Sequence, residues 1–282
     1  MKKILVPTDF SKASANAVDV AYDIAKRSGA SITMLHVIEE AGTDSYSVVG
    51  QGHPNNTEES RFMVELIKKS RKQLEKVVNE PKYKDVNIEG ELRVGNAFHG
   101  MRTIITDHKV DLVVMGTRGH TKLEKMVIGS NTERVVRQMR CPVLTVHDKP
   151  AKVEFKNIVY ATAMSKDEEV FSRIVKRTQQ IYNSTIHLVR INTPGDFQRD
   201  KVVKAYMEKF AKKLQLKNFT VNVYNDLTAE EGIIYFADSI NADLVCMATH
   251  GRTGFAHVMA GSIAEDVVGQ SKRPVLTFVV KH

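Results

Sequence analysis

The stretch DLVVMGTRGHT at residues 111–121 returns as DLVCMATHGRT at residues 243–253, an offset of 132 residues. Two further pairs keep this offset: GSNTERVV at Gly129 with GSIAEDVV at Gly261, and PVLTV at Pro142 with PVLTF at Pro274. Across these pairs and the residues between them, seventeen of thirty-six positions are identical, which chance does not produce. The sequence therefore predicts a tandem duplication.

The front of each copy aligns at a different offset. ILVPTDFS at residues 4–11 matches IVYATAMS at residues 158–165, an offset of 154, so the first copy carries 22 extra residues (154 minus 132). We place them in the polar, glycine-rich residues 42–60, as a long loop that is either a lid over a ligand or an inert connection. The short polar linker HDKPAKVEFK joins the copies. The predicted domains are residues 1–147 and 153–282.

Each copy alternates strands with helices. In the first copy the apolar strand patterns are KKILVPT, SITMLHVI, VNIEGELRV, VDLVVMGT and CPVLTVH, and helical patterns separate them. Strands that alternate with helices of this length predict βαβ units, and hence a parallel sheet covered on both faces. The predicted fold class is α/β, with two tandem doubly wound domains of five parallel strands each.

The composition is that of a globular chain with a basic balance. The 282 residues are 42% hydrophobic and 26% charged, without an apolar run long enough to span a bilayer. Cys141 and Cys246 form no disulfide framework, so we expect reduced packing residues in a cytoplasmic protein. The net charge of +8 is spread along helices such as KKSRKQLEK, without an aromatic-interleaved platform. We therefore expect neither a nucleic-acid nor a membrane partner.

Three glycines and a serine follow the fourth strand of the first copy. In doubly wound sheets a ligand lies beyond the carboxyl ends of the strands, where the strand order reverses. Gly116 and Gly119 would let the backbone approach a ligand there. Gly129 and Ser130 open the last helix, whose free N–H groups favour an anion. Each residue alone has a structural explanation, as a tight turn, a relieved bend or a helix cap. Together, on one rim, they favour a phosphate site.

The spacing Gly116, two residues, Gly119, nine residues, Gly129, Ser130 resembles the nucleotide-binding pattern of the universal stress protein family. The resemblance covers nearly the whole chain, twice over. It implies the universal stress protein fold, also described as adenine nucleotide alpha hydrolase-like. It further implies ATP, or ADP or AMP, as the ligand, with Mg²⁺ as an optional companion.

The ends of the first and second strands also resemble the universal stress protein family. VPTDFS resembles the family's first-strand ending, where an acidic residue, here Asp9, reaches the adenosine. HVIEE resembles the second-strand ending, whose backbone, here at Val37, holds the adenine. From the residues alone, Asp9 could instead cap the following helix, a role that Ser11 would fill equally well. The candidate cofactor-binding residues are Pro7, Thr8, Asp9, Val37, Met115, Gly116, Thr117, Arg118, Gly119, His120, Gly129, Ser130 and Asn131. No catalytic residue and no metal ligand is assigned.

The second copy departs from the pattern. Asp9 corresponds to Ala163, which has no hydrogen-bonding side chain, and Gly116 corresponds to Ala248, which adds a Cβ atom. The rest of the motif is kept as Gly251, Gly261 and Ser262. We expect the first domain to bind the nucleotide, and the second, a degenerate site, to bind it weakly or to take another ligand.

Two classes of function remain open for the first domain. One is a stress-response protein that acts as a nucleotide-dependent sensor or interaction module. The alternative is a weak ATPase or autophosphorylating enzyme with Arg118, His120 and Lys122 near the phosphates, and Ser130 or Thr121 as phosphoryl acceptor. No water-orienting carboxylate or glutamine is evident, and the Walker and GxGxxG motifs are absent. We therefore favour the sensor.

The last strands predict how the two domains meet. PVLTV and PVLTF are apolar and end their sheets, and a bare edge of this kind invites pairing. The resemblance implies that these edges meet across a two-fold axis, so we expect an intrachain pseudo-dimer. We also expect two chains to associate as a homodimer.

Overall fold

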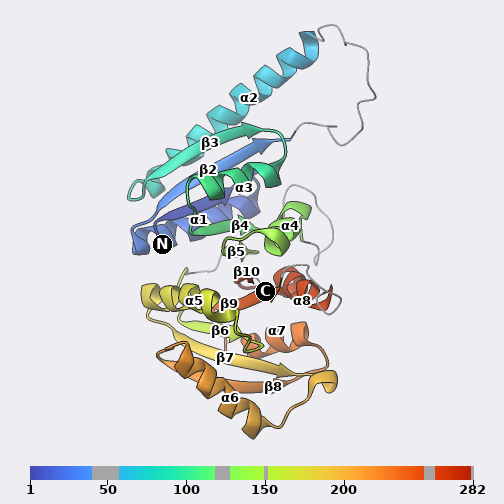
Figure 1. Ribbon diagram of the computed structural model, residues 1–282. Coiled ribbons are helices and arrows are strands. Elements are labelled where there is room, and N and C mark those ends of the chain that lie inside the picture. The colour runs from blue at the N-terminus through green and yellow to red at the C-terminus, as the bar shows by residue number, and fades with distance from the viewer. Residues whose placement is uncertain (40–56, 118–127, 149–151, 251–257, 281–282) are drawn as a thin grey trace.

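The computed structural model describes residues 1–39, 57–117, 128–148, 152–250 and 258–280 (Figure 1). We call residues 1–147 the first half and residues 153–282 the second half. Figure 1 shows the two halves stacked end to end, with the blue-to-green half above the yellow-to-red one. Both have the predicted alternation of strands and helices.

The elements of the first half are β1 (Lys3–Pro7), α1 (Lys12–Ser28), β2 (Ser31–Ile38), α2 (Thr57–Val78), β3 (Ile88–Val94), α3 (Ala97–Asp107), β4 (Leu112–Gly116), α4 (Ser130–Gln138) and β5 (Val143–Val146). Those of the second half are β6 (Asn157–Ala161), α5 (Glu168–Tyr182), β7 (Thr185–Asn192), α6 (Asp200–Lys213), β8 (Phe219–Asn225), α7 (Ala229–Ser239), β9 (Leu244–His250), α8 (Val258–Gln270) and β10 (Val275–Val280). Short 3₁₀ turns, Pro81–Tyr83 and Pro194–Asp196, precede β3 and α6.

Small polar residues determine where several helices begin and end. Ser11, Asn96 and Thr228 each accept a hydrogen bond from the backbone N–H three residues later, and so begin α1, α3 and α7. Gly29 ends α1 with a φ of 70°, a left-handed conformation that favours glycine.

The strands form one sheet, in the order β3-β2-β1-β4-β5-β10-β9-β6-β7-β8. Within each half neighbouring strands are parallel. Ile4 of β1 pairs with Ile32 of β2 on one side and Leu112 of β4 on the other. The strand order therefore reverses at β1, which opens a crevice at the carboxyl ends of β1, β2 and β4. The predicted α/β fold class is confirmed.

The antiparallel pair β5 and β10 joins the two halves. Leu144 lies opposite Leu276, and the Thr145 hydroxyl donates to the carbonyl oxygen of Val275 at 3.1 Å. Apolar side chains from both halves form one continuous cluster through this junction. The predicted meeting of the two last strands is confirmed, and it fuses two five-stranded sheets into one.

Helices α4 and α8 also meet at the junction. Arg137 of α4 donates from Nε and Nη2 to the two carboxylate oxygens of Glu265 in α8, both at 2.5 Å. Only 23% and 15% of these two side chains are exposed. A two-pronged, partly buried ion pair of this kind links the helices in a fixed orientation.

A double-mutant cycle measures this link. Replacing Arg137 and Glu265 by alanine, singly and together, should reveal a coupling energy of about 1 kcal/mol or more in urea unfolding. The control cycle uses Arg173 and Glu169, whose side chains are 70% and 58% exposed and 3.5 Å apart. There we expect about 0.3 kcal/mol. Equal couplings in the two cycles would contradict a special role for the junction pair.

The insertion in the first half is only partly a loop. Residues 42–60 were predicted as loop, but α2 begins at Thr57, so residues 57–60 are helical and that part of the prediction is wrong. Residues 42–56 lie outside the described residues. Because α2 has 22 residues and α6 has 14, eight of the extra residues lengthen the helix. Figure 1 shows α2 projecting beyond β3.

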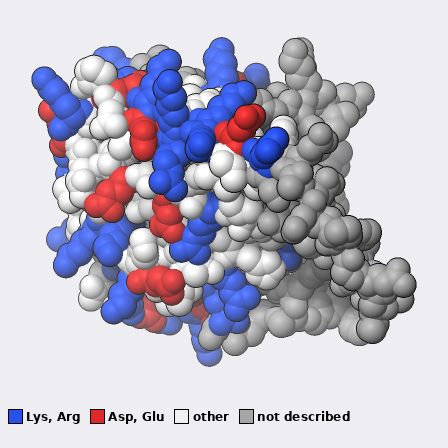
Figure 2. Space-filling model, turned by 90° about the horizontal axis from the view of Figure 1, so that it is seen from above, with Lys and Arg blue, Asp and Glu red and all other residues white. Residues whose placement is uncertain are grey.

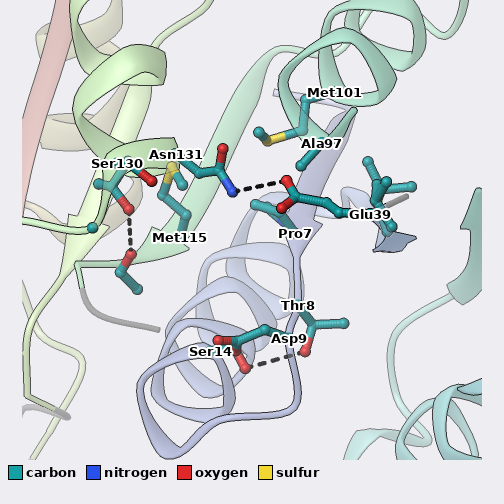
Figure 3. Close-up of a pocket in the computed structure, with 15 residues that line it drawn as sticks. Pro7, Thr8, Asp9, Ser14, Glu39, Ala97, Met101, Met115, Ser130 and Asn131 are labelled. Atoms are coloured by element: carbon teal, nitrogen blue, oxygen red, sulfur yellow. Dashed lines mark hydrogen bonds between the residues drawn. The ribbon is translucent and has the colours of Figure 1, made fainter. Parts of the chain in front are cut away.

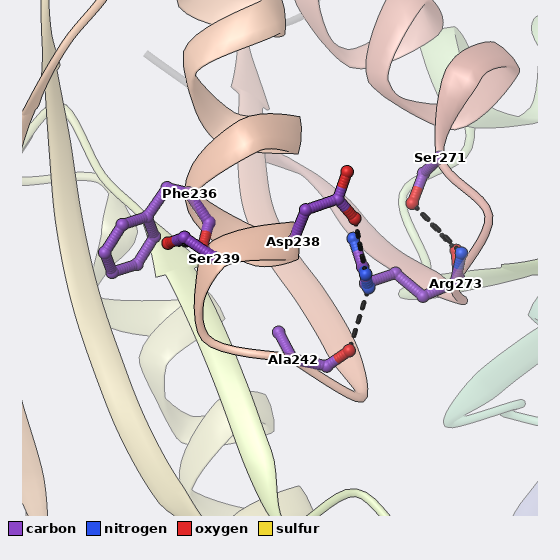
Figure 4. A network of polar contacts seen from close by, with 6 residues as sticks. All are labelled: Phe236, Asp238, Ser239, Ala242, Ser271 and Arg273. Carbon is purple, nitrogen blue, oxygen red and sulfur yellow. Dashed lines mark hydrogen bonds and ion pairs between the residues drawn. The ribbon is translucent and has the colours of Figure 1, made fainter.

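A polar network ties two turns of the second half together (Figure 4). Arg273, just before β10, donates from Nε to the carbonyl oxygen of Ala242 at 2.8 Å and from Nη2 to Asp238 at 2.7 Å. The equivalent residue of the first half is Cys141, which donates its thiol to the carbonyl oxygen of Val110. The same two turns are thus joined in both halves by different chemistry, which shows how far the copies have diverged.

The cysteines, the helices and the charged surface bear on the expected compartment and partners. Cys141 and Cys246 are free and buried, as predicted, and burial raises the pKa of the Cys141 thiol to about 12, so it packs as a neutral side chain. Among the described helices, none is long and apolar enough to cross a membrane. On the face shown in Figure 2, Lys and Arg side chains are interspersed with Asp and Glu. This mixture is typical of a solvated surface.

Candidate functional site

A cavity of about 370 Å³ opens at the carboxyl ends of β1, β2 and β4. It lies where the strand order reverses, the predicted position of a ligand. The first turn of α4 forms one side and α3 forms another (Figure 3). The lining residues are Pro7, Thr8, Asp9, Ser14, Leu35, Val37, Glu39, Ala97, Met101, Met115, Gly116, Gly129, Ser130, Asn131 and Thr132.

Nine of the thirteen predicted residues line this cavity. They are Pro7, Thr8, Asp9, Val37, Met115, Gly116, Gly129, Ser130 and Asn131. Thr117 is buried beside the cavity, and its hydroxyl lies 3.0 Å from Nδ1 of His147. The predicted residues Arg118, Gly119 and His120 lie outside the described residues. The structure therefore brings together residues from sequence segments more than 100 positions apart.

Six lining residues were not predicted from the sequence. They are Ser14, Leu35, Glu39, Ala97, Met101 and Thr132. Glu39 lies within the quoted stretch HVIEE and Thr132 directly follows the predicted Asn131, so the sequence could have indicated both. Ala97 and Met101 lie four residues apart on one face of α3, and only the packing of α3 against β2 and α4 brings them to the cavity.

The loop between β1 and α1 shows which of its residues caps the helix. Ser11, and not Asp9, caps α1, because its hydroxyl accepts from the N–H of Ser14 at 3.2 Å. Asp9 accepts from the N–H of Ser11 at 2.9 Å, within the tight turn in which Phe10 has a φ of 63°. The Thr8 hydroxyl accepts from the N–H of Phe10 and donates to Ser14 at 3.1 Å. These bonds hold Asp9 on the rim of the cavity.

Gly116 is required by packing inside the protein. A Cβ atom at this position would lie 2.8 Å from the carbonyl carbon of Ala13 and 2.9 Å from its oxygen. Real Cβ atoms do not approach backbone so closely, so β4 and α1 can touch only because residue 116 is glycine. The sequence prediction explained this glycine by the approach of a ligand, whereas the structure gives a closer contact with α1.

The first turn of α4 faces the cavity with Gly129, Ser130, Asn131 and Thr132. Gly129 is the N-cap residue and has no side chain to occupy the free N–H groups that follow it. The Thr132 hydroxyl donates to the carbonyl oxygen of Gly116 at 3.0 Å and fixes this turn against β4. The helix dipole adds roughly half a positive charge at the same place. This side of the cavity is suited to an anion.

The other sides of the cavity are carboxylate and apolar. Asn131 donates from Nδ2 to Glu39 at 3.4 Å, which links α4 to the end of β2 across the opening (Figure 3). Asp9 and Glu39 offer acceptors for hydroxyl or amino groups, while Val37 and Met101 offer apolar walls. Within the described residues, no three His, Cys, Asp or Glu side chains are grouped so that they could hold a metal ion. The cavity can therefore receive a ligand with an apolar part, donor groups and an anionic end.

The second half has different residues at the equivalent positions. Besides Ala163 and Ala248, Thr193 replaces Glu39 and Ile263 replaces Asn131, so the polar link across the opening is absent there. Ile263 packs against the apolar cluster on this face of the sheet, as does Ile191, which replaces Val37. At the sequence level, the difference between the two halves rests on two positions of the site, and the structure extends it to at least five.

Glu168 is a further difference, at the position of Ser14. Its carboxylate is almost fully buried, with 1% of the residue exposed, and accepts from the hydroxyls of Thr162 at 2.7 Å and Tyr160 at 3.0 Å. The N–H of Ser165 also donates to it at 3.0 Å. Burial raises the pKa of Glu168, and these hydrogen bonds oppose the rise.

Comparison with known proteins gives a consistent result. The family model for the universal stress protein family matches residues 1–147 and again residues 154–279. The universal stress protein MJ0531 of Methanocaldococcus jannaschii is 35% identical over 152 residues, which cover 54% of this chain and 84% of that protein. Universal stress protein Slr1230 of Synechocystis is 24% identical over 298 residues, which cover 99% of this chain and 100% of that protein.

Among solved structures, the crystal structure of a universal stress protein from Archaeoglobus fulgidus superposes with a TM-score of 0.75. The match has 20% sequence identity and covers 99% of this chain and 96% of that one, so it establishes a shared fold over the whole length. The family model matches both halves of the chain separately. The chain belongs to the universal stress protein family.

Proposed function

We propose that the first half binds an adenine nucleotide, ATP or else ADP or AMP, and that the protein acts as a nucleotide-dependent sensor or interaction module in a stress response. The cavity at the strand reversal carries this proposal, because it combines an anion-binding helix end with carboxylate acceptors and apolar walls. The choice of adenine rests on the glycine spacing that the chain shares with its family.

Each part of the cavity has a role in this proposal. The N–H groups at Ser130 and Asn131 bind the phosphates, with Mg²⁺ as an optional companion held mainly by the nucleotide. Asp9 accepts hydrogen bonds from the adenosine, and the backbone at Val37 holds the adenine edge. Met101 and Met115 pack against the faces of the base, where polarizable side chains suit a flat ring.

The position of α4 favours a sensor. Its first turn lines the cavity, while Arg137 in its last turn bonds to Glu265 of the second half. A ligand that shifts this nine-residue helix therefore acts directly on the junction between the halves.

The alternative function is that of a weak ATPase or autophosphorylating enzyme. It relies on Arg118, His120 and Lys122, which lie outside the described residues. Turnover of ATP above about one per minute would favour this alternative.

Mass spectrometry and calorimetry together test the proposed function. The protein is denatured directly after purification and the released small molecules are identified, and the emptied protein is then titrated with ATP, ADP, AMP and GTP. We expect one adenine nucleotide per chain, with GTP bound at least about tenfold more weakly. Failure of all four ligands to bind at millimolar concentration would overturn the proposal.

A further inference from the structure

We propose that the residue at one position of the first helical turn, Ser14 in α1 and Glu168 in α5, decides which half of the protein accepts an anionic ligand. Ser14 leaves the first half open to phosphates, and the carboxylate of Glu168 excludes them from the second half. This inference rests on the proposed function and names the specificity determinant of the same site.

The two residues occupy equivalent places in nearly identical loops. Both loops place a threonine at the end of the first strand, Thr8 or Thr162, and both contain a residue with positive φ two positions later. Thr8 donates its hydroxyl to the neutral Ser14, which lines the cavity. Thr162 donates its hydroxyl to Glu168. The fold thus presents the same donor to a hydroxyl in one half and to a carboxylate in the other.

The carboxylate of Glu168 is fixed in place. It is buried and accepts three hydrogen bonds, and Tyr160, one of the donors, replaces the apolar Val6 of the first half. Because three donors hold the carboxylate of Glu168, it cannot move aside for a phosphate. The hydroxyls of Tyr160 and Thr162 and the N–H of Ser165 bind this carboxylate and are not free for a phosphate.

The first turns of α1 and α5 also differ in charge, and α5 is again the more acidic of the two. The first turn of α1 contains no acidic residue, so its N-terminal dipole remains available beside the cavity. The first turn of α5 contains Glu168 and Glu169, and its N-cap residue is Asp167. The N-cap and first turn of α5 therefore carry three acidic side chains, whereas the N-cap and first turn of α1 carry none.

A negative charge at the position of Ser14 should weaken the binding of negatively charged ligands more than the binding of uncharged ones. A carboxylate at position 14 would add a negative charge to a cavity that already contains Asp9 and Glu39, and this added charge repels a triphosphate, whereas uncharged adenosine feels no such force. Steric disturbance of the site would instead affect both ligands alike. The comparison of ATP with adenosine therefore separates the two effects.

The test transfers the glutamate to the first half. The variant Ser14→Glu is compared with Ser14→Gln, which has nearly the same shape without the charge, by calorimetric titration with ATP and with adenosine. We expect Ser14→Glu to lose at least about tenfold more ATP affinity than Ser14→Gln, while the two variants lose adenosine affinity equally, within about threefold. The extra loss of ATP affinity should shrink as the salt concentration rises.

A second variant keeps the inference testable if Ser14→Glu does not fold. Ala15 is exposed and corresponds to Glu169, so Ala15→Glu adds a charge to the same turn without burying it. It should weaken ATP binding by about threefold and leave adenosine binding unchanged. Equal losses for ATP and adenosine, or for Ser14→Glu and Ser14→Gln, would overturn the inference. If the unmodified protein binds neither ligand, the proposed function itself fails.

Discussion

Asp9→Ala is expected to weaken ATP binding roughly ten- to a hundredfold. The carboxylate of Asp9 lies on the cavity rim, and loss of one hydrogen bond to a charged group is worth about 1.5–3 kcal/mol. Calorimetric titration measures the change directly. Asp9→Asn keeps an oxygen that can accept from the N–H of Ser11, so it separates the ligand contact from the loop contact and should retain part of the affinity.

The matched control for this experiment lies in the second half. Ala163 occupies the position of Asp9 there, and Ala163→Gly should leave ATP affinity nearly unchanged. If Ala163→Gly abolishes binding while Asp9→Ala does not, the nucleotide site belongs to the other half. The glycine motif of the first half would then be a purely structural turn.

Gly116→Val is expected to lower the free energy of unfolding by about 1–3 kcal/mol and to disturb ligand binding as well. The added Cβ atom would lie 2.8 Å from the backbone of Ala13, which cannot rotate away as a side chain can. Urea unfolding monitored by circular dichroism measures the change in midpoint, since the slope should stay constant.

Gly100→Ala is the control for this prediction. A Cβ atom at Gly100 in α3 would meet only side chains, Val37 at 3.3 Å and Arg93 at 3.8 Å, and alanine favours a helix over glycine by about 1 kcal/mol. We therefore expect this variant to be neutral or slightly more stable. An unchanged unfolding midpoint for Gly116→Val would show that β4 and α1 can separate without loss, against the packing argument.

The two halves of the chain also illustrate how a duplicated site diverges. The polar residues Asp9, Glu39 and Asn131 of the first half correspond to Ala163, Thr193 and Ile263 of the second. In the second half, isoleucine side chains pack at two positions of the site, and Glu168 accepts hydrogen bonds from its own loop. The carboxylate of Glu168 thereby holds this loop in place.

The sequence by itself determined the duplication, the alternation of strands and helices, and the strand ends at which a ligand would lie. These features are local, because a repeat, an apolar strand or a glycine spacing is contained in neighbouring residues. The end of the first strand pattern placed Asp9 at the carboxyl edge of the sheet, and nine of the predicted residues do line one cavity.

Only the tertiary structure decided which distant residues meet. The wall formed by Ala97 and Met101 depends on how α3 packs, and the reason for Gly116 lies 103 positions earlier, at Ala13. The burial of Glu168 likewise depends on the packing of α5 against β9 and β10, which brings its carboxylate to the hydroxyl of Tyr160 in β6. Such contacts depend on how whole helices and strands pack against one another. This packing cannot be inferred from short stretches of neighbouring residues.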